Sequence, residues 1–232
     1  MPQQPDHVVA VVAHPDDAEM MAYGTLRRYR ERGAAVTVVV ATTGVNGVSL
    51  TDRDQGVRLG REERVAESAA SYTGTGIDLV CLQLTDGALV ANQELISRVE
   101  AELVRLGCTV LLTHSRHAGN DHQDHLAVAQ AAANAATRVA TCTTILHGEP
   151  HAPRSGFRPT VLVDITDWID AKVKALEAHQ TQTGRWYLSE EYTHHRARDA
   201  GWRLAPARAA RGRCFEVFEA SLITLIGPGG QA

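Results

Sequence analysis

Residues 7–19 read HVVAVVAHPDDAE, a run of small and β-branched apolar residues that passes directly into a histidine and three carboxylates. Short continuous runs of this kind are typical of strands buried on both faces of a parallel sheet. The sequence therefore predicts a first strand over 7–13, with the histidine and the carboxylates at its carboxyl end.

The same kind of run recurs along the chain, with amphipathic stretches between the runs. Strands alternating with helices of this length form right-handed βαβ units. The predicted fold is α/β, a three-layer Rossmann-like sandwich around a mostly parallel sheet. A late run, RCFEVFEA at 213–220, is predicted as a further strand at a sheet edge. The other predicted strands are 35–41, 77–82, 109–113, 141–146 and 160–165, and the helices are 18–31, 58–72, 92–106, 123–137 and 167–180.

Composition limits the class of protein. One domain is expected over residues 1–232, with about 184–232 as a C-terminal extension. The chain has 23 Lys and Arg against 27 Asp and Glu, which argues against a nucleic-acid binder or a polybasic membrane anchor. The apolar stretch before His14 is too short for a signal peptide or a membrane span, so we expect a cytoplasmic protein. The four cysteines are expected to be buried free thiols.

The residues after the first strand differ from a nucleotide-binding loop. No G-x-G-x-x-G pattern is present, and the chain instead carries His14, Asp16 and Asp17. Adjacent aspartates repel unless a cation or hydrogen-bond donors offset their charge. The sequence leaves two interpretations open, a metal site or two aspartates that cap the following helix.

A second cluster, HSRHAGNDHQDH at 114–125, follows the predicted fourth strand. Carboxyl ends of parallel strands meet at one edge of the sheet, where ligand crevices form. We therefore expect His14, Asp17 and His125 to converge as a His/Asp/His set. Three protein ligands with an open fourth position are typical of catalytic zinc.

The paired motifs AHPDDAE at 13–19 and HQDH at 122–125 resemble those of the PIG-L, or LmbE-like, family of zinc-dependent N-deacetylases. The resemblance implies an enzyme that removes an acetyl group from an amino sugar of the N-acetylglucosamine type, in a biosynthetic or antibiotic pathway. It also implies one Zn²⁺ per chain, with another divalent metal as the alternative. Further similar segments are ATTGVNG at 41–47, GREERVAESA at 60–69, LTDG at 84–87, VDITDWIDAKVKALEAHQTQ at 163–182 and RCFEVFEA.

The resemblance assigns roles to the first motif and to His125. His14, Asp17 and His125 match the family's zinc ligands, and Asp16 matches its general base. Zinc lowers the pKa of a bound water to about 7, and a nearby carboxylate that takes the water's proton produces a nucleophile for the amide carbonyl.

Within the second motif, His122 matches the family histidine that stabilises the oxyanion, and Asp124 matches the carboxylate that orients it. A protonated imidazole held by Asp124 is the predicted donor. One fixed donor near a developing oxyanion contributes roughly 3–4 kcal/mol. The alternative is a histidine at a helix start with no partner.

The sequence gives weaker indications of the residues that contact the substrate. Arg61 and Asp86 match family positions near the substrate, although surface ion pairs explain them nearly as well. His114 and His117 either touch the N-acylated small-molecule substrate or are loop histidines that are exposed or form a hydrogen bond that closes the loop. The segment 185–203 either lines the substrate or forms an oligomer contact, so a homo-oligomer stays open. His179 and Gln182 match a late family element without a defined role.

The chain departs from the family pattern where Gly44-Val45 replaces a Gly-Glu pair and Gln123 replaces a common proline. The missing glutamate leaves a polar group absent or supplied by Asn46. A competing hypothesis is a non-catalytic α/β module that binds a small molecule and has purely structural His and Asp clusters. Such a module would bind no metal, and a chelator would not change its thermal stability.

Overall fold

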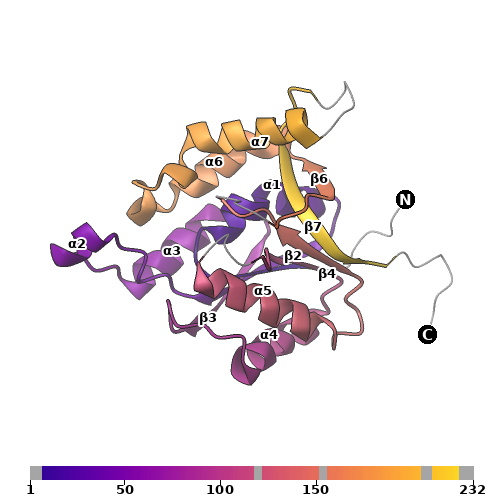
Figure 1. Cartoon of the computed structure of the whole chain (residues 1–232), viewed down its shortest axis with the longest axis horizontal. Coiled ribbons are helices and arrows are strands. Elements are labelled where there is room, and N and C mark those ends of the chain that lie inside the picture. Colours follow the sequence, from indigo (N-terminus) through magenta and orange to yellow (C-terminus); the bar gives the residue numbers. More distant parts are fainter. Residues whose placement is uncertain (1–6, 118–121, 152–155, 205–210, 225–232) are drawn as a thin grey trace.

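The computed structural model describes residues 7–117, 122–151, 156–204 and 211–224. Within these residues a seven-stranded sheet has the order β3-β2-β1-β4-β5-β7-β6, with helices on both faces (Figure 1). The strands are β1 His7–Val12, β2 Ala35–Thr42, β3 Asp78–Leu84, β4 Val110–His114, β5 Thr144–Gly148, β6 Val161–Asp164 and β7 Phe215–Ile223. The helices are α1 Asp17–Glu31, α2 Leu50–Asp54, α3 Arg61–Ser71, α4 Gln93–Leu106, α5 Gln123–Ala136, α6 Ile169–Glu177 and α7 Glu190–Leu204, with 3₁₀ turns η1 Thr166–Trp168, η2 Gln180–Gln182 and η3 Trp186–Leu188.

The predicted α/β class is confirmed. Strands β1 to β5 pair in parallel, and β1 lies between β2 and β4. Strand β1 is buried on both faces because its residues alternate between two apolar layers. Val9 and Val11 pack against α4 and α5 on one face of the sheet. Val8 and Ala10 belong to the layer on the other face, which contains α1, Tyr72 directly after α3, and Ala175 in α6. Among the described residues, no helix has the length and apolar character needed to cross a bilayer.

The position of the last strand differs from the prediction. Strand β7 lies inside the sheet, antiparallel to both β5 and β6, and β6 forms the edge. Its Val217 and Phe218 are almost completely buried. A single strand sequence specifies burial but not which neighbours supply it, so the edge assignment was wrong. Residues 205–210 and 225–232 of the predicted extension lie outside the described residues.

Helix α7 was not predicted from the sequence. Its buried residues are Thr193, Ala197, Ala200 and Gly201. These recur at helical spacing, but they are small and the remaining residues are mostly charged or polar. A stripe without large apolar residues gives a weak periodic signal, which is why the segment looked irregular.

Gly24 allows α1 to approach the end of β6. A Cβ at this position would lie 2.5 Å from Cγ2 of Ile165. We expect Gly24→Ala to lower the free energy of unfolding by about 1–3 kcal/mol through overpacking, although alanine has the higher helix propensity. Urea denaturation measures this change. Gly184→Ala, where no atom lies within 4 Å, is the control, and a Gly24→Ala protein as stable as the parent would contradict the packing argument.

Candidate metal centre

The centre lies where β1 and β4 end side by side, at the point where the strand order changes direction. Such switch points form ligand crevices in open α/β sheets. His14 follows β1, Asp17 begins α1, and His125 lies in the first turn of α5. His14 Nδ1 lies 3.4 Å from Asp17 Oδ2 and 3.1 Å from His125 Nε2, and His125 Nε2 lies 3.2 Å from Asp17 Oδ1. The structure therefore brings the predicted His/Asp/His set together.

These three side chains fit a zinc ion. Zinc bonds of about 2.0–2.1 Å in a tetrahedron place neighbouring ligand atoms about 3.3–3.4 Å apart, and the separations here are 3.1–3.4 Å. Two imidazoles and a carboxylate are also a common catalytic zinc set. A second group that could hold a metal, His14 with His122 and Asp124, shares His14 with the first.

Two further carboxylates fix the orientation of His14. Its Nε2 lies 3.1 Å from Asp86 Oδ1 and 3.2 Å from Asp124 Oδ2, which leaves Nδ1 for a metal. Burial alone would lower the pKa of His14, but hydrogen bonds to Asp124, Asp17 and Asp86 raise it to about 12. So many buried carboxylates around one imidazole favour a bound cation.

Zinc binding is expected to release about one proton per chain at pH 7. A ligating imidazole nitrogen must be neutral, whereas a histidine with a pKa of about 12 is protonated in the metal-free chain. Metal affinity should therefore increase as the pH rises. Calorimetric titration in two buffers of different ionisation enthalpy counts the protons. His117→Gln, which lies outside the metal set, should leave the count unchanged, and a release near zero in the parent would refute the expectation.

Asp16 does not cap α1, so that interpretation is wrong for this residue. Its side chain makes no capping hydrogen bond, and its backbone is left-handed with φ 93°. Such a conformation costs about 1–3 kcal/mol in a non-glycine residue and persists where the surroundings impose it. Burial and the neighbouring Asp17 raise the pKa of Asp16 to about 6, against the opposing charge of Arg64. A carboxylate with this pKa is ionised at neutral pH yet basic enough to accept a proton.

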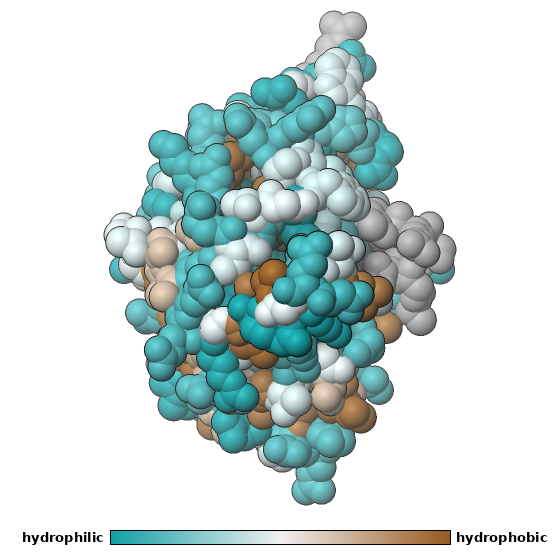
Figure 2. Space-filling view, turned by 90° about the vertical axis from the view of Figure 1, so that its left-hand side faces the viewer, coloured by the Kyte–Doolittle hydropathy of each residue, from teal (hydrophilic) through white to brown (hydrophobic). Residues whose placement is uncertain are grey.

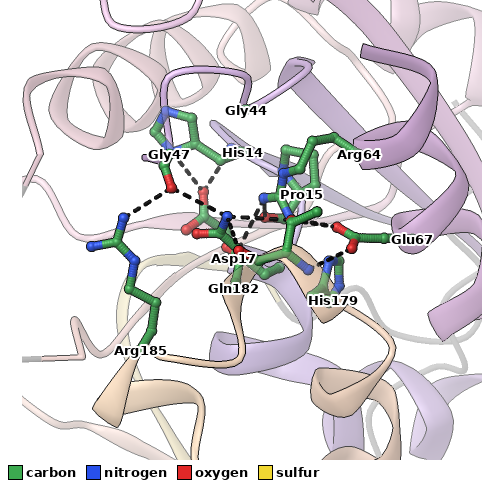
Figure 3. A network of polar contacts seen from close by, with 12 residues as sticks. His14, Pro15, Asp17, Gly44, Gly47, Arg64, Glu67, His179, Gln182 and Arg185 are labelled. Carbon is green, nitrogen blue, oxygen red and sulfur yellow. Dashed lines mark hydrogen bonds and ion pairs between the residues drawn. The ribbon is translucent and has the colours of Figure 1, made fainter. Parts of the chain in front are cut away.

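Arg64 on α3 holds the turn that carries Asp16. Its guanidinium is almost fully buried. Its Nη2 donates to Asp16 Oδ2 at 3.1 Å and to Pro15 O at 2.9 Å, and its Nη1 donates to Glu67 Oε2 at 2.9 Å (Figure 3). Arg61, the residue predicted to lie near the substrate or to form a surface ion pair, is exposed in the first turn of the same helix. The buried polar stripe Arg64, Glu67, Ser68 and Ser71 is the helical-period signal that would have identified Arg64.

Asp86 lies at the centre rather than at its rim. It is 8% exposed, and its Oδ2 accepts from the backbone N–H of Asn46 at 2.6 Å while its Oδ1 faces His14. Asn46 thus supplies a polar contact in the loop where Val45 replaces the family glutamate. The structure gives Asp86 the geometry of a residue that orients a metal ligand.

Asp124 is held differently from the prediction. Its carboxylate accepts from the backbone N–H groups of Gly87 and Leu89 at 2.7 and 3.0 Å. It lies 4.0 Å from His122 Nδ1, beyond hydrogen-bond distance. The predicted contact that orients His122 is therefore absent, because backbone donors from the loop after β3 and the imidazole of His14 engage this carboxylate.

His122 is the residue before α5, and its Nδ1 accepts from the backbone N–H of Asp124 at 3.2 Å. Burial and the neighbouring His14 and His125 lower its pKa, which disfavours the protonated ring. The side chain is 45% exposed, with its ring centroid 4.9 Å from that of His14. His122 thus lies at the rim of the centre, and its role as a donor stays a prediction.

The two other histidines of the second cluster have structural contacts. His114 is buried, its Nε2 accepts from the backbone N–H of Ala13 at 3.0 Å, and its ring stacks on His125 with centroids 4.2 Å apart. His117 Nε2 lies 2.7 Å from Glu219 Oε2 on β7. These contacts match the interpretation in which hydrogen bonds fix the loop. Asp121 of this loop lies outside the described residues.

The late family element forms part of the same buried network. His179 is fully buried, with Nε2 3.1 Å from Glu19 Oε1. Gln182 Nε2 donates to Gly47 O at 3.2 Å (Figure 3). Glu19 therefore lies behind the centre, and the segment after α6 closes against the loop after β2.

The chain matches a known protein family and several known proteins with related sequences. The family model described as GlcNAc-PI de-N-acetylase, PIG-L, matches residues 9–136, which is more than half of the chain. The chain belongs to the PIG-L family. It is accordingly a deacetylase-type hydrolase acting on amides, the class named for its relatives.

Two sequence relatives show the range of named members of the PIG-L family. The uncharacterized deacetylase YaiS of Escherichia coli is 26% identical over 181 residues, covering 75% of this chain and 90% of YaiS. The 1D-myo-inositol 2-acetamido-2-deoxy-alpha-D-glucopyranoside deacetylase 1 of Saccharopolyspora erythraea is 25% identical over 240 residues, covering 78% of this chain and 79% of that protein.

Solved structures share the fold. The N,N'-diacetylchitobiose deacetylase of Pyrococcus horikoshii superposes with a TM-score of 0.75 at 19% identity, covering 94% of this chain and 84% of that one. GalB, the 4-carboxy-2-hydroxymuconate hydratase of Pseudomonas putida, superposes with a TM-score of 0.80 at 21% identity, covering 96% and 98%. At these identities the likeness shows the architecture alone.

Proposed function

We propose that the protein is a zinc-dependent N-deacetylase that hydrolyses the N-acetyl or a similar N-acyl group of an amino sugar or a related small metabolite. The observation that carries the proposal is the His14, Asp17 and His125 set, with the largely buried carboxylate of Asp16 adjacent to Asp17. Relatives named as deacetylases of an acetamido sugar support this substrate class. Small N-acylated molecules are the proposed partners, with neither nucleic acid nor membrane, and the cytoplasm is the proposed location.

In this mechanism His14, Asp17 and His125 hold the ion. Bound zinc supplies Lewis acidity and lowers the pKa of a coordinated water. Asp16 accepts the proton of the attacking water and returns it to the amine that leaves. Arg64 keeps the Asp16 carboxylate in place, and Asp86 and Asp124 keep the Nε2 proton of His14 directed away from the metal side.

His122 is the proposed donor to the oxyanion. Because its Nδ1 is occupied by the backbone N–H of Asp124, the Nε2–H is the group that can donate. The contact with the start of α5 fixes the imidazole at the rim of the centre. Donors fixed before the reaction lower the barrier because they need no reorganisation.

Metal analysis followed by an acetate-release screen tests the proposal. We expect one zinc per chain, release of acetate from at least one N-acetyl amino sugar, loss of activity with a chelator and recovery with added zinc. Absence of metal, together with a melting temperature that a chelator does not change, would instead support the non-catalytic module. Bound zinc without acetate release from any amino sugar would refute the proposed substrate class.

A further inference from the structure

Four aromatic rings form a cluster beside the metal centre. Trp186 and Tyr187 come from η3, Tyr192 from α7 and His151 from the segment after β5. The Trp186 centroid lies 5.6 Å from Tyr187, 4.9 Å from Tyr192 and 6.3 Å from His151. His151 also lies 4.5 Å from Tyr187. We call these four residues the aromatic platform.

The platform adjoins the crevice. Arg185, one residue before Trp186, donates from Nη2 to Gly47 O at 2.9 Å, and Figure 3 shows this contact close to His14 and Asp17. Gly47 follows Asn46, which binds Asp86 next to His14. Tyr187 packs against the buried cluster of Met20, Leu176 and Leu188, and Met20 lies in α1, the helix that begins at Asp17. The platform thus begins where the loop after β2 closes over the metal ligands.

Trp186 is 58% exposed although three rings contact it. A covered indole buries about 150–250 Å² of surface. Because neighbouring rings already restrict the Trp186 side chain, stacking a ligand ring on it would cost little conformational entropy. The face of the molecule drawn in Figure 2 is mainly hydrophilic, with hydrophobic side chains in limited areas. A single flat aromatic side chain on a polar rim is suited to one ring of a small molecule rather than to a broad apolar protein interface.

We propose that Trp186 stacks against a second ring of the substrate, joined to the amino sugar that carries the scissile amide. This inference rests on the proposed function and specifies it, because it makes the preferred substrate larger than a monosaccharide. The apolar C–H face of a sugar and the face of an aromatic aglycone share the chemistry that an indole recognises. The test has separate arms for these two sources.

Three test compounds distinguish stacking on a sugar ring from stacking on an aromatic aglycone. N-acetylglucosamine has one ring, N,N'-diacetylchitobiose adds a sugar ring, and the 4-nitrophenyl glycoside of N-acetylglucosamine adds an aromatic ring. We expect the zinc-loaded parent to have the higher kcat/KM for at least one two-ring compound. Trp186→Ala should lower that kcat/KM about tenfold, mainly through KM, and leave N-acetylglucosamine unchanged. Trp186→Tyr, which keeps an aromatic face, should recover most of the loss.

Trp202 provides a matched control. It is 63% exposed near the other end of α7, so Trp202→Ala should change none of the three kcat/KM values. Equal effects of Trp186→Ala on one-ring and two-ring compounds, or no effect on either, would overturn the platform proposal while the deacetylase proposal stands. If no compound is hydrolysed, calorimetric binding of the same compounds to Asp16→Asn and to Asp16→Asn with Trp186→Ala decides the platform separately. Equal binding to both proteins, including no binding to either, overturns it.

Discussion

Asp16→Asn is expected to lower kcat by roughly 10³-fold while the chain keeps one zinc. A positioned general base typically contributes 10²–10⁴-fold, and an amide of the same shape cannot accept the proton. Asp16 is not among the three residues whose ligand atoms converge, so the metal set is retained. Steady-state kinetics with metal analysis on the same preparation measures both quantities.

The pH profile provides an independent readout. The pKa of Asp16 is raised to about 6 by burial and by Asp17. The ionised form that accepts a proton is lost as the pH falls through the pKa, so activity of the parent should decrease on the acid side. Asp16→Asn should lose this part of the profile. Asp54→Asn, at an exposed position in α2, is the control, and full activity of Asp16→Asn would sink the assignment of the base.

Arg64→Met is expected to lower the free energy of unfolding by about 3–5 kcal/mol, the usual cost of removing one partner of a buried ion pair. Methionine keeps much of the side-chain volume but leaves the carboxylates of Asp16 and Glu67 without their guanidinium. The contacts to Pro15 O and to Thr181 Oγ1, which connect α3 with the turn after β1 and with η2, are lost as well. Denaturant unfolding of the metal-free protein measures the change.

The pH dependence of the loss in unfolding free energy distinguishes the loss of ion pairs from the loss of packing in Arg64→Met. Burial would raise the pKa of Glu67, but hydrogen bonds from Thr181 and Arg64 lower it overall. A carboxylate with a lowered folded pKa stabilises the fold above its ordinary pKa, and this contribution is lost as the pH falls. The difference between the parent and Arg64→Met should therefore be smaller at pH 4 than at pH 7.

Arg61→Met is the matched control for Arg64→Met. It removes an arginine from the same helix one turn earlier, at an exposed position, and should change stability by no more than about 0.5 kcal/mol. Similar losses in both variants would mean that the buried network does not depend on Arg64. The pair also tests directly which of the two arginines of GREERVAESA serves the centre.

The local sequence pattern was sufficient to predict an element where the burial of its residues follows a simple repeat. The run at 8–13 is apolar at every position, and β1 is covered on both faces because helices pack on each side of the sheet. The motifs at 13–19 and 122–125 follow strands that become neighbours, so their residues meet at one edge. The convergence of His14, Asp17 and His125 followed from these two facts together with the rule for parallel sheets.

Other features depend on contacts between segments that are far apart in the chain. Helix α3 carries Arg61 and Arg64 three residues apart, and only its docking against the turn after β1 shows that Arg64 is the buried one. Asp124 follows His122 by two residues, yet backbone N–H groups of Gly87 and Leu89 take its carboxylate. A sequence gives the donors and acceptors but not the distances that decide which pairs form.

The sequence by itself determined the α/β class, the mostly parallel sheet, the family and the convergence of His14, Asp17 and His125. Each of these follows from local periodicity or from motifs adjoining strand ends. Only the tertiary structure decided the place of β7, the existence of α7, the choice of Arg64 and the aromatic platform around Trp186. These depend on packing between distant segments, because burial and hydrogen-bond partners are properties of the assembled fold.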